Sequence, residues 1–240
     1  KKQWLLTAVC IAAASATRIV GIFLIPSLLI QLLFEKHAAE LSKLFKQLKK
    51  YQFTLFSQDL LRILQNFILK NAWPISAILL GSIGLLLYMT YLWYDFSDPL
   101  YFLHVQAEFG SGRQENFVLL PQVLWRAIKV VVSIPINLRW WSYLQELLLT
   151  TFGLGILLYG IYKKFSIPIG WTIFSLFAIL VPPLTGTLSS MPRYVLVAIP
   201  IFVILAQLKL TKITWIVLYC CCAALLTCNL ILFIQGYWVA

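Results

Sequence analysis

Long apolar segments are the feature that most limits how this chain can fold. An α-helix needs about 20 residues to cross about 30 Å of hydrocarbon, and several segments reach that length. Lipid offers the backbone no hydrogen-bond partners, so a spanning segment must be a helix or a strand of a closed barrel. Barrel strands alternate apolar and polar residues, whereas these segments are continuously apolar. We therefore expect an all-α, polytopic transmembrane helix bundle that forms a single domain over residues 1–240.

Composition supports the same expectation. The chain is 61% hydrophobic and only 11% charged, whereas about a quarter of the residues in soluble proteins are charged. The expected spanning segments are 4–34, 72–93, 140–162, 167–188, 194–208 and 213–234.

The first apolar segment, 4–34, is longer than one crossing requires, at roughly 46 Å as a single helix. Polar residues around Arg18, together with Gly21, interrupt it midway. One interpretation is a pair of short helices with Arg18 at the tip between them. The other is a single long tilted helix whose arginine extends to the headgroups. The sequence leaves both open.

The chain carries a net charge of +11, and its densest group of basic residues lies in one segment. Segment 35–70 contains seven lysines and arginines against three acidic residues. Its apolar residues Leu41, Leu44, Phe45 and Leu48 follow the i, i+3, i+4, i+7 spacing of one helix face. This pattern predicts a basic amphipathic helix on the anionic cytoplasmic leaflet. Such a face also attracts nucleic acid non-specifically, but the partner that we expect is membrane lipid and not nucleic acid.

Charge also predicts the orientation of the chain, because cationic loops concentrate in the cytoplasm. Segments 35–70, 163–164 and 209–212 are therefore expected inside, and 95–139 and 189–193 outside. Segment 95–139 is expected to be an outer loop region with a helix at the membrane interface. The expected location is a bacterial plasma membrane or the endoplasmic reticulum membrane, with the active face outside or lumenal.

Three polar groups from distant parts of the chain fall on this predicted outer face, namely Arg18, the loop that begins at Asp95, and Arg193. Their common side predicts one shared site. The alternative is that each charge merely anchors its helix among lipid headgroups. Within the loop, Asp98-Pro99 is typical of a helix start, where a carboxylate caps free amides and proline fits the first position. Asp98 therefore either caps a helix or takes part in the site, and the sequence leaves both roles open.

Cysteine chemistry is not indicated. All five cysteines lie in apolar segments, and no C-x-x-C pair is present. We expect them to be buried packing residues. No metal site is expected, no cofactor motif is identified, and the need for a divalent metal is not determined by the sequence.

Three motifs, taken in order, resemble those of the polytopic mannosyltransferases of the PIG-V type and their bacterial relatives, which are GT-C-like membrane glycosyltransferases. Residues 16–21 (A-T-R-I-V-G) resemble the family's A-T-R-P-x-G. Residues 96–106 (F-S-D-P-L-Y-F-L-H-V-Q) resemble F-G-D-P-L-x-F-x-H-x-Q. Residues 189–194 (S-S-M-P-R-Y) resemble S-S-x-P-R-Y. The departures are Ile19 for proline, Ser97 for glycine, and Phe109 where tryptophan is common.

The resemblance implies transfer of a sugar, mannose in the family, from a polyprenyl-phosphate donor to a lipid, glycan or protein acceptor. It assigns the donor phosphate to Arg193, with Arg18 as a second candidate. It assigns the sugar hydroxyls or the loop shape to Asp98, His104 and Gln106, and substrate binding also to Tyr194. A base must still deprotonate the acceptor hydroxyl, and the weak candidates in this chain are Asp98 and Glu108.

One departure concerns catalysis itself. Members of this class carry a catalytic carboxylate in a first outer loop near the N-terminus, and no residue before Trp4 supplies one. Because the chain begins at Lys1 rather than methionine, we expect either the C-terminal portion of a longer protein or a chain that has lost activity. The alternative class of function is a non-catalytic membrane protein, such as a lipid-linked-sugar transporter or a structural subunit.

Overall fold

The computed structural model describes residues 3–49, 53–109, 113–114 and 116–237, and these residues form helices and no strands. They divide into two compact units, each described by itself: Lys1–His104 with Pro168–Phe177, and Val105–Ile167 with Ala178–Ala240. The all-α expectation is confirmed. Four helical segments are long and apolar enough to cross a membrane, as expected of a membrane protein: Ile19–Leu44, Ala72–Phe96, Leu138–Tyr162 and Lys212–Ile234.

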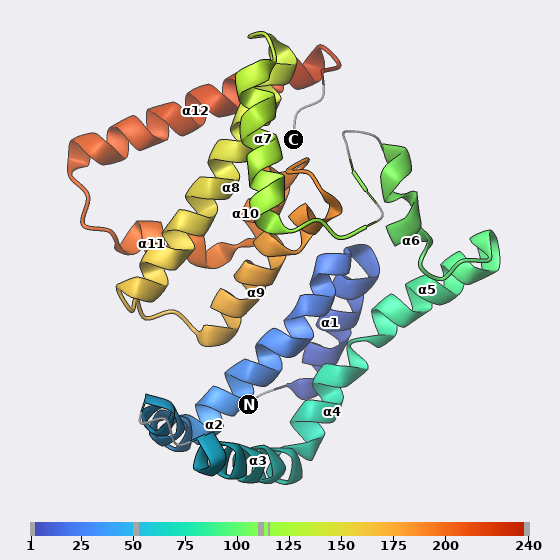
Figure 1. The fold of residues 1–240 in the computed structure, drawn as a ribbon, viewed down its shortest axis with the longest axis vertical. Coiled ribbons are helices and arrows are strands. Elements are labelled where there is room, and N and C mark those ends of the chain that lie inside the picture. The colour runs from blue at the N-terminus through green and yellow to red at the C-terminus, as the bar shows by residue number, and fades with distance from the viewer. Residues whose placement is uncertain (1–2, 50–52, 110–112, 115, 238–240) are drawn as a thin grey trace. The chain divides into compact units, whose positions relative to one another are not determined.

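Unit 1 starts with two helices joined by a tight turn. A third helix packs on the end of the second, and a spanning segment made of two shorter helices follows (Figure 1). Its elements are α1 (Trp4–Thr17), η1 (Ile19–Phe23), α2 (Leu24–Lys49), α3 (Phe53–Lys70), α4 (Ala72–Leu80), α5 (Ile83–Phe96), α6 (Tyr101–His104) and most of α9 (Ile169–Leu180).

Unit 2 contains the remaining elements of the chain. They are η2 (Val105–Phe109), α7 (Leu120–Ser133), α8 (Leu138–Tyr162), η3 (Pro182–Thr185), α10 (Met191–Val197), α11 (Ile199–Gln207) and α12 (Lys212–Ile234).

The N-terminal apolar segment folds as two helices, which decides between the two interpretations. The chain leaves α1 at Arg18, whose backbone is extended (φ −144°, ψ 131°), and then reverses through η1 into α2 (Figure 1). Gly21 permits this reversal, because a Cβ there would overlap the backbone of Ala14 and Ser15. Arg18 is exposed at the turn.

The core of unit 1 lies where α1, α2, α3 and α4 meet. Its buried members are Ile11, Ile25, Leu32, Phe67 and Ile78. Small residues bring α1 close to the α4–α5 segment, as is common between membrane helices. A Cβ on Gly84 would overlap the Ala12 carbonyl, and the Ser15 hydroxyl donates to the Gly81 carbonyl at 3.1 Å.

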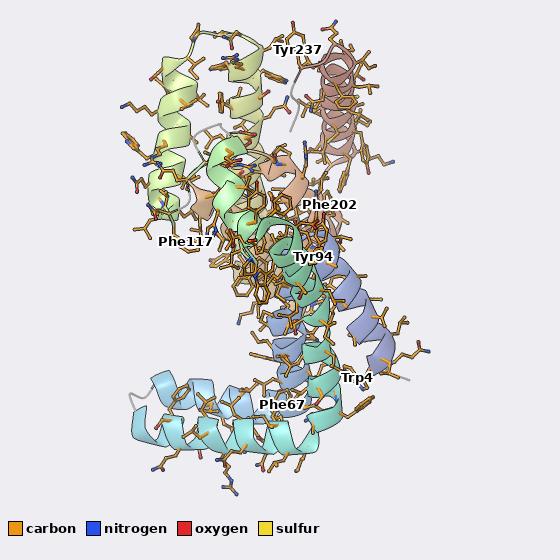
Figure 2. All side chains as sticks on the ribbon, turned by 90° about the vertical axis from the view of Figure 1, so that its right-hand side faces the viewer. Trp4, Phe67, Tyr94, Phe117, Phe202 and Tyr237 are labelled. Atoms are coloured by element: carbon orange, nitrogen blue, oxygen red, sulfur yellow. The ribbon has the colours of Figure 1, made fainter. Side chains whose placement is uncertain are left out.

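The basic segment 35–70 is not one amphipathic helix, so that part of the prediction is wrong. It forms the end of α2 and the whole of α3, which lie side by side near Phe67 in Figure 2. Leu41 and Leu44 are buried against Ile63 of α3. The apolar stripe is therefore used within the protein, because a neighbouring helix covers it. Phe45 and Leu48 lie outside the residues whose side chains the structure describes.

Two of the expected spanning segments are broken by proline. The helix expected over 167–188 ends as α9 at Leu180, before Pro182 and Pro183 begin η3. The helix expected over 194–208 begins at Met191 and breaks at Ala198 into α10 and α11. Pro200 lacks an N–H and its ring displaces the carbonyl four residues earlier, which explains this second break. These two predictions of continuous spans were wrong.

The last helix, α12, is the least covered of the long helices. None of its residues is buried, and side chains extend from every side of it in Figure 2. Its one described side-chain link to α8 is a reciprocal amide pair, in which Gln145 and Asn229 donate to each other at 2.9 and 3.0 Å. The cysteines on α12 and Cys10 are exposed, so the expectation that they would be buried was wrong. They lie on helix faces that no other described helix covers.

Helix α7 occupies the expected position of the helix in the outer loop region 95–139. Pro121 lies in its first turn, where the missing N–H has no helical partner to lose. It packs on α8, with Val123 buried and the Trp140 indole donating to the Val131 carbonyl at 2.8 Å. Asn137 caps α8 by accepting from the Trp140 amide. The turn between α7 and α8 is therefore well determined by local contacts.

Candidate functional site

Asp98 and His104, which the sequence analysis selected, are in direct contact in unit 1. The His104 Nδ1 and an Asp98 carboxylate oxygen are 2.6 Å apart. The other Asp98 oxygen accepts from the Leu100 amide at 2.9 Å, which forms an Asx-type turn around Pro99. Asp98 therefore caps this turn, as expected, and α6 begins after it at Tyr101.

The residue that precedes Asp98 has an unusual backbone conformation. Ser97 has a left-handed backbone (φ 55°, ψ 17°) where α5 ends. Glycine adopts that conformation without steric cost, whereas a residue with a Cβ does so less readily. The turn geometry of the motif is thus retained with serine.

The contact with His104 predicts a pH-dependent stability. Hydrogen bonding from His104 lowers the pKa of Asp98 below its ordinary value of 3.8. A carboxyl with a lowered pKa stabilises the fold above its unfolded pKa, and this contribution is lost as the pH falls through the folded value. We therefore expect Asp98→Asn to lower the melting temperature of the detergent-solubilised protein most at pH 6 to 7, and progressively less below about pH 4.

A matched variant, His104→Asn, removes the same hydrogen bond and should show the same loss of pH dependence. A melting-temperature difference between parent and Asp98→Asn that stays constant from pH 7 to pH 3 would contradict the assignment.

Gln106 and Glu108 lie just beyond this turn and belong to unit 2. The Gln106 side-chain oxygen accepts from the Arg113 guanidinium at 3.0 Å. Glu108 is exposed on η2. Gln106 therefore helps to hold the loop between α6 and α7 in shape, and Glu108 lies at the surface.

The motif at 189–194 forms a tight turn into α10. Ser190, which precedes the helix, has a left-handed backbone (φ 66°, ψ 14°) although it is not glycine. Non-glycine residues in this region cost about 1–3 kcal/mol and are retained where the surroundings impose them. Arg193 is exposed on α10, and Tyr194 is half-buried.

The surroundings that impose the Ser190 conformation include Glu146, which the sequence analysis did not select. Glu146 lies in the first half of α8 and is only 4% exposed. Its Oε1 accepts from the Ser190 amide at 2.9 Å. The Arg113 guanidinium lies near enough for its charge to act on the Glu146 carboxyl. A buried acidic residue thus meets the backbone of the motif.

Glu146 lines two cavities in unit 2. The larger, of about 520 Å³, is lined by Leu138, Arg139, Ser142, Tyr143, Glu146, Ser189, Leu232, Gly236 and Tyr237. The smaller, of about 100 Å³, is also lined by Tyr143, Glu146 and Ser189, and adds Arg126 from α7. A carboxylate, two arginines and several hydroxyl groups therefore line two cavities that share Tyr143, Glu146 and Ser189.

A sequence signal for this site was available. Arg139, Ser142, Tyr143 and Glu146 follow i, i+3, i+4, i+7 and so share one face of a helix. An acidic residue within an apolar spanning segment is by itself a functional candidate. This polar face was not predicted, because the residues around it are strongly apolar and the segment was interpreted only as a membrane span.

The candidates from the motifs lie in both units. Unit 1 contains Arg18 and the Asp98–His104 pair, and unit 2 contains Gln106, Arg193 and Tyr194. The shared site for Arg18, Asp98 and Arg193 stays a prediction. Within the described residues there is no group of three or more histidine, cysteine or acidic side chains that could hold a metal.

A scan of protein-family models, a search of curated proteins and a search of solved structures each found no match to this chain. Function is therefore inferred from the motifs and the geometry alone.

Proposed function

We propose that this chain is a multi-pass membrane glycosyltransferase that transfers a sugar from a polyprenyl-phosphate donor to an acceptor on the outer or lumenal face. Mannose is the sugar that the resemblance suggests. A lipid, glycan or protein acceptor would supply the attacking hydroxyl.

The observation that carries this proposal is the position of the third motif, residues 189–194, beside a cavity. Ser189, in the turn of the third motif, lines a cavity that is also lined by Glu146 and Arg139, and Glu146 accepts from the next residue, Ser190. A motif that resembles a glycosyltransferase signature therefore lies beside groups that suit a phosphorylated, hydroxylated ligand. Carboxylates accept hydrogen bonds from hydroxyl groups, and arginine donates paired hydrogen bonds to phosphate.

The chemistry of the proposed reaction needs mainly positive charge. Cations stabilise the phosphate that leaves as the bond to the sugar breaks. In this proposal Arg193 binds the donor phosphate and Arg18 is the second candidate, as the motifs suggest. The arginine that lines the cavity beside Glu146 is Arg139, so this cavity offers a phosphate-binding position distinct from Arg193. Both carboxylate oxygens of Asp98 are already used within its own turn, which supports a role in loop shape rather than as the base.

The alternative is a non-catalytic protein that moves lipid-linked sugars or serves as a structural subunit. Transporters place ionisable residues near the bilayer midplane on broken helices. Segments 72–93 and 213–234 contain no charged residue, which favours a surface site over a path through these spans.

The decisive experiment follows the donor in vesicles that contain the full-length protein. Vesicles receive polyprenyl-phosphate mannose labelled in the sugar, together with a membrane extract as the source of acceptor. A transferase converts the donor to polyprenyl phosphate and moves the label to a new product. Intact labelled donor that crosses the bilayer would instead establish the transporter, and neither change would refute both functions.

Orientation gives a separate prediction. Asn116 and Lys163 are both exposed, and the charge pattern assigns them to opposite sides. In a chain whose native cysteines are replaced by alanine, we expect Asn116→Cys to react with an impermeant thiol reagent in intact cells. We expect Lys163→Cys to react only after permeabilisation. Labelling of Lys163→Cys but not Asn116→Cys in intact cells would reverse the orientation.

A further inference from the structure

Glu146 has a hydrogen-bonding requirement that the protein meets only in part. One carboxylate oxygen accepts from the Ser190 amide, and the other has no hydrogen-bond partner among the residues that the structure describes. The nearby Arg113 charge favours the carboxylate but fills no acceptor position on this oxygen. A buried carboxylate with an unfilled acceptor position is costly, because it has lost a hydrogen bond from water without gaining an equivalent one. Glu146 also lines the 520 Å³ cavity, so a ligand there can reach it.

The other charged groups around the cavities restrict what that ligand can be. Arg139 lines the same cavity as Glu146, and Arg126 lines the adjoining one. A cationic ligand would meet repulsion from these guanidinium groups. A purely anionic ligand would meet repulsion from Glu146. The ligand that satisfies both has hydroxyl donors on one side and a negative charge on the other.

We propose that the cavity of unit 2 lined by Glu146 and Arg139 is a binding site for a sugar phosphate, with Glu146 accepting from sugar hydroxyls and Arg139 binding the phosphate. Both residues lie on one face of α8, seven positions apart and therefore about two turns from each other. Ser142 and Tyr143 lie between them on that face and add hydroxyl groups.

The volume and the position of the cavity suit such a ligand. Pockets for small molecules measure about 300–1,000 Å³, and this one lies within that range. The Arg139 end of the face lies in the first turn of α8, where the helix dipole favours a negative group. Glu146 lies roughly 10 Å from Arg139 along the α8 axis, toward the middle of the helix.

The test is calorimetric binding to the full-length protein in detergent, with three probes: mannose 1-phosphate, methyl α-mannoside and inorganic phosphate. Only the choice of mannose rests on the proposed function. We expect mannose 1-phosphate to bind most tightly. Glu146→Gln should weaken it by about tenfold to hundredfold, the range for a lost hydrogen bond to a charged group. The same variant should bind inorganic phosphate at least as tightly as the parent does, because the negative charge that repels this anion is gone. Arg139→Gln should weaken both phosphate-bearing probes.

Matched controls separate the site from general effects. Glu35→Gln makes the same substitution at an exposed glutamate of unit 1, and should not alter binding. Ser142→Leu fills the cavity without touching the bond between Glu146 and Ser190, and should abolish binding of mannose 1-phosphate even if Glu146→Gln folds poorly. Unaltered binding in Ser142→Leu, or no binding by the parent, would overturn the proposal.

Binding and transfer can fail independently. Glu146-dependent binding without any sugar transfer would keep this site and reject the glycosyltransferase. If the protein transfers sugar but neither Glu146→Gln nor Ser142→Leu alters the binding of mannose 1-phosphate, the enzyme function stands and this site is rejected.

Discussion

Replacing Arg193 by lysine should reduce sugar transfer by the full-length protein by one to three orders of magnitude. A guanidinium group makes two parallel hydrogen bonds to phosphate, whereas an ammonium group acts as a point charge. Each tenfold loss of rate corresponds to about 1.4 kcal/mol of transition-state stabilisation. Arg193 is exposed on α10, so the change opens no cavity and should leave expression and melting temperature near those of the parent. The vesicle assay with labelled polyprenyl-phosphate mannose measures the effect.

Two further variants make this result interpretable. Arg62→Lys is the same change at an exposed arginine of α3, outside all three motifs, and should leave transfer unchanged. Arg193→Ala should reduce transfer at least as much as Arg193→Lys. If both Arg193 variants transfer sugar at the rate of the parent, Arg193 is a headgroup anchor and has no part in the reaction.

Replacing Gly84 by alanine should destabilise unit 1 strongly. The added Cβ would overlap the Ala12 carbonyl, which belongs to the α1 backbone and cannot rotate away as a side chain does. Overpacking of this kind typically costs about 1–3 kcal/mol, against the roughly 1 kcal/mol that alanine gains over glycine in a helix. We expect a lower melting temperature and a smaller yield of monodisperse protein in detergent.

Gly155 on α8 provides the matched control for this change. A Cβ at Gly155 meets nothing within 4 Å, so Gly155→Ala should be neutral or slightly stabilising. Equal melting temperatures for Gly84→Ala and Gly155→Ala would show that α1 does not lie against α5 at this position.

The helix breaks illustrate what could be read from local sequence. The polar interruption at Arg18 marked a real turn, because Gly21 permits the close return of the chain. Proline gave equally local signals at Pro182 and Pro200 that were underweighted, since hydrophobicity alone suggested continuous spans. The Asp98-Pro99 pair marks a turn just before α6, and the turn could be predicted because an Asx-type turn depends on neighbours within two residues.

Contacts between segments that are far apart in the sequence could not be predicted from local patterns. The basic face of 35–70 was expected to bury its apolar stripe in lipid, but α3 covers Leu41 and Leu44 instead. A periodic pattern identifies the apolar face of a helix, but it does not show whether lipid or another helix covers that face.

The sequence by itself determined the helical class, the membrane character and the turns at Arg18 and Asp98, because hydrophobicity and turn-forming residues act over a few neighbouring residues. Only the tertiary structure decided that Glu146 meets the Ser190 amide, 44 positions away, and that Glu146 and the neighbouring Ser189 line one cavity. The reason is physical: a buried carboxylate is stabilised by whichever donor the packing of α8 and α10 brings to it. That donor's identity depends on three-dimensional packing and is not encoded in any local pattern.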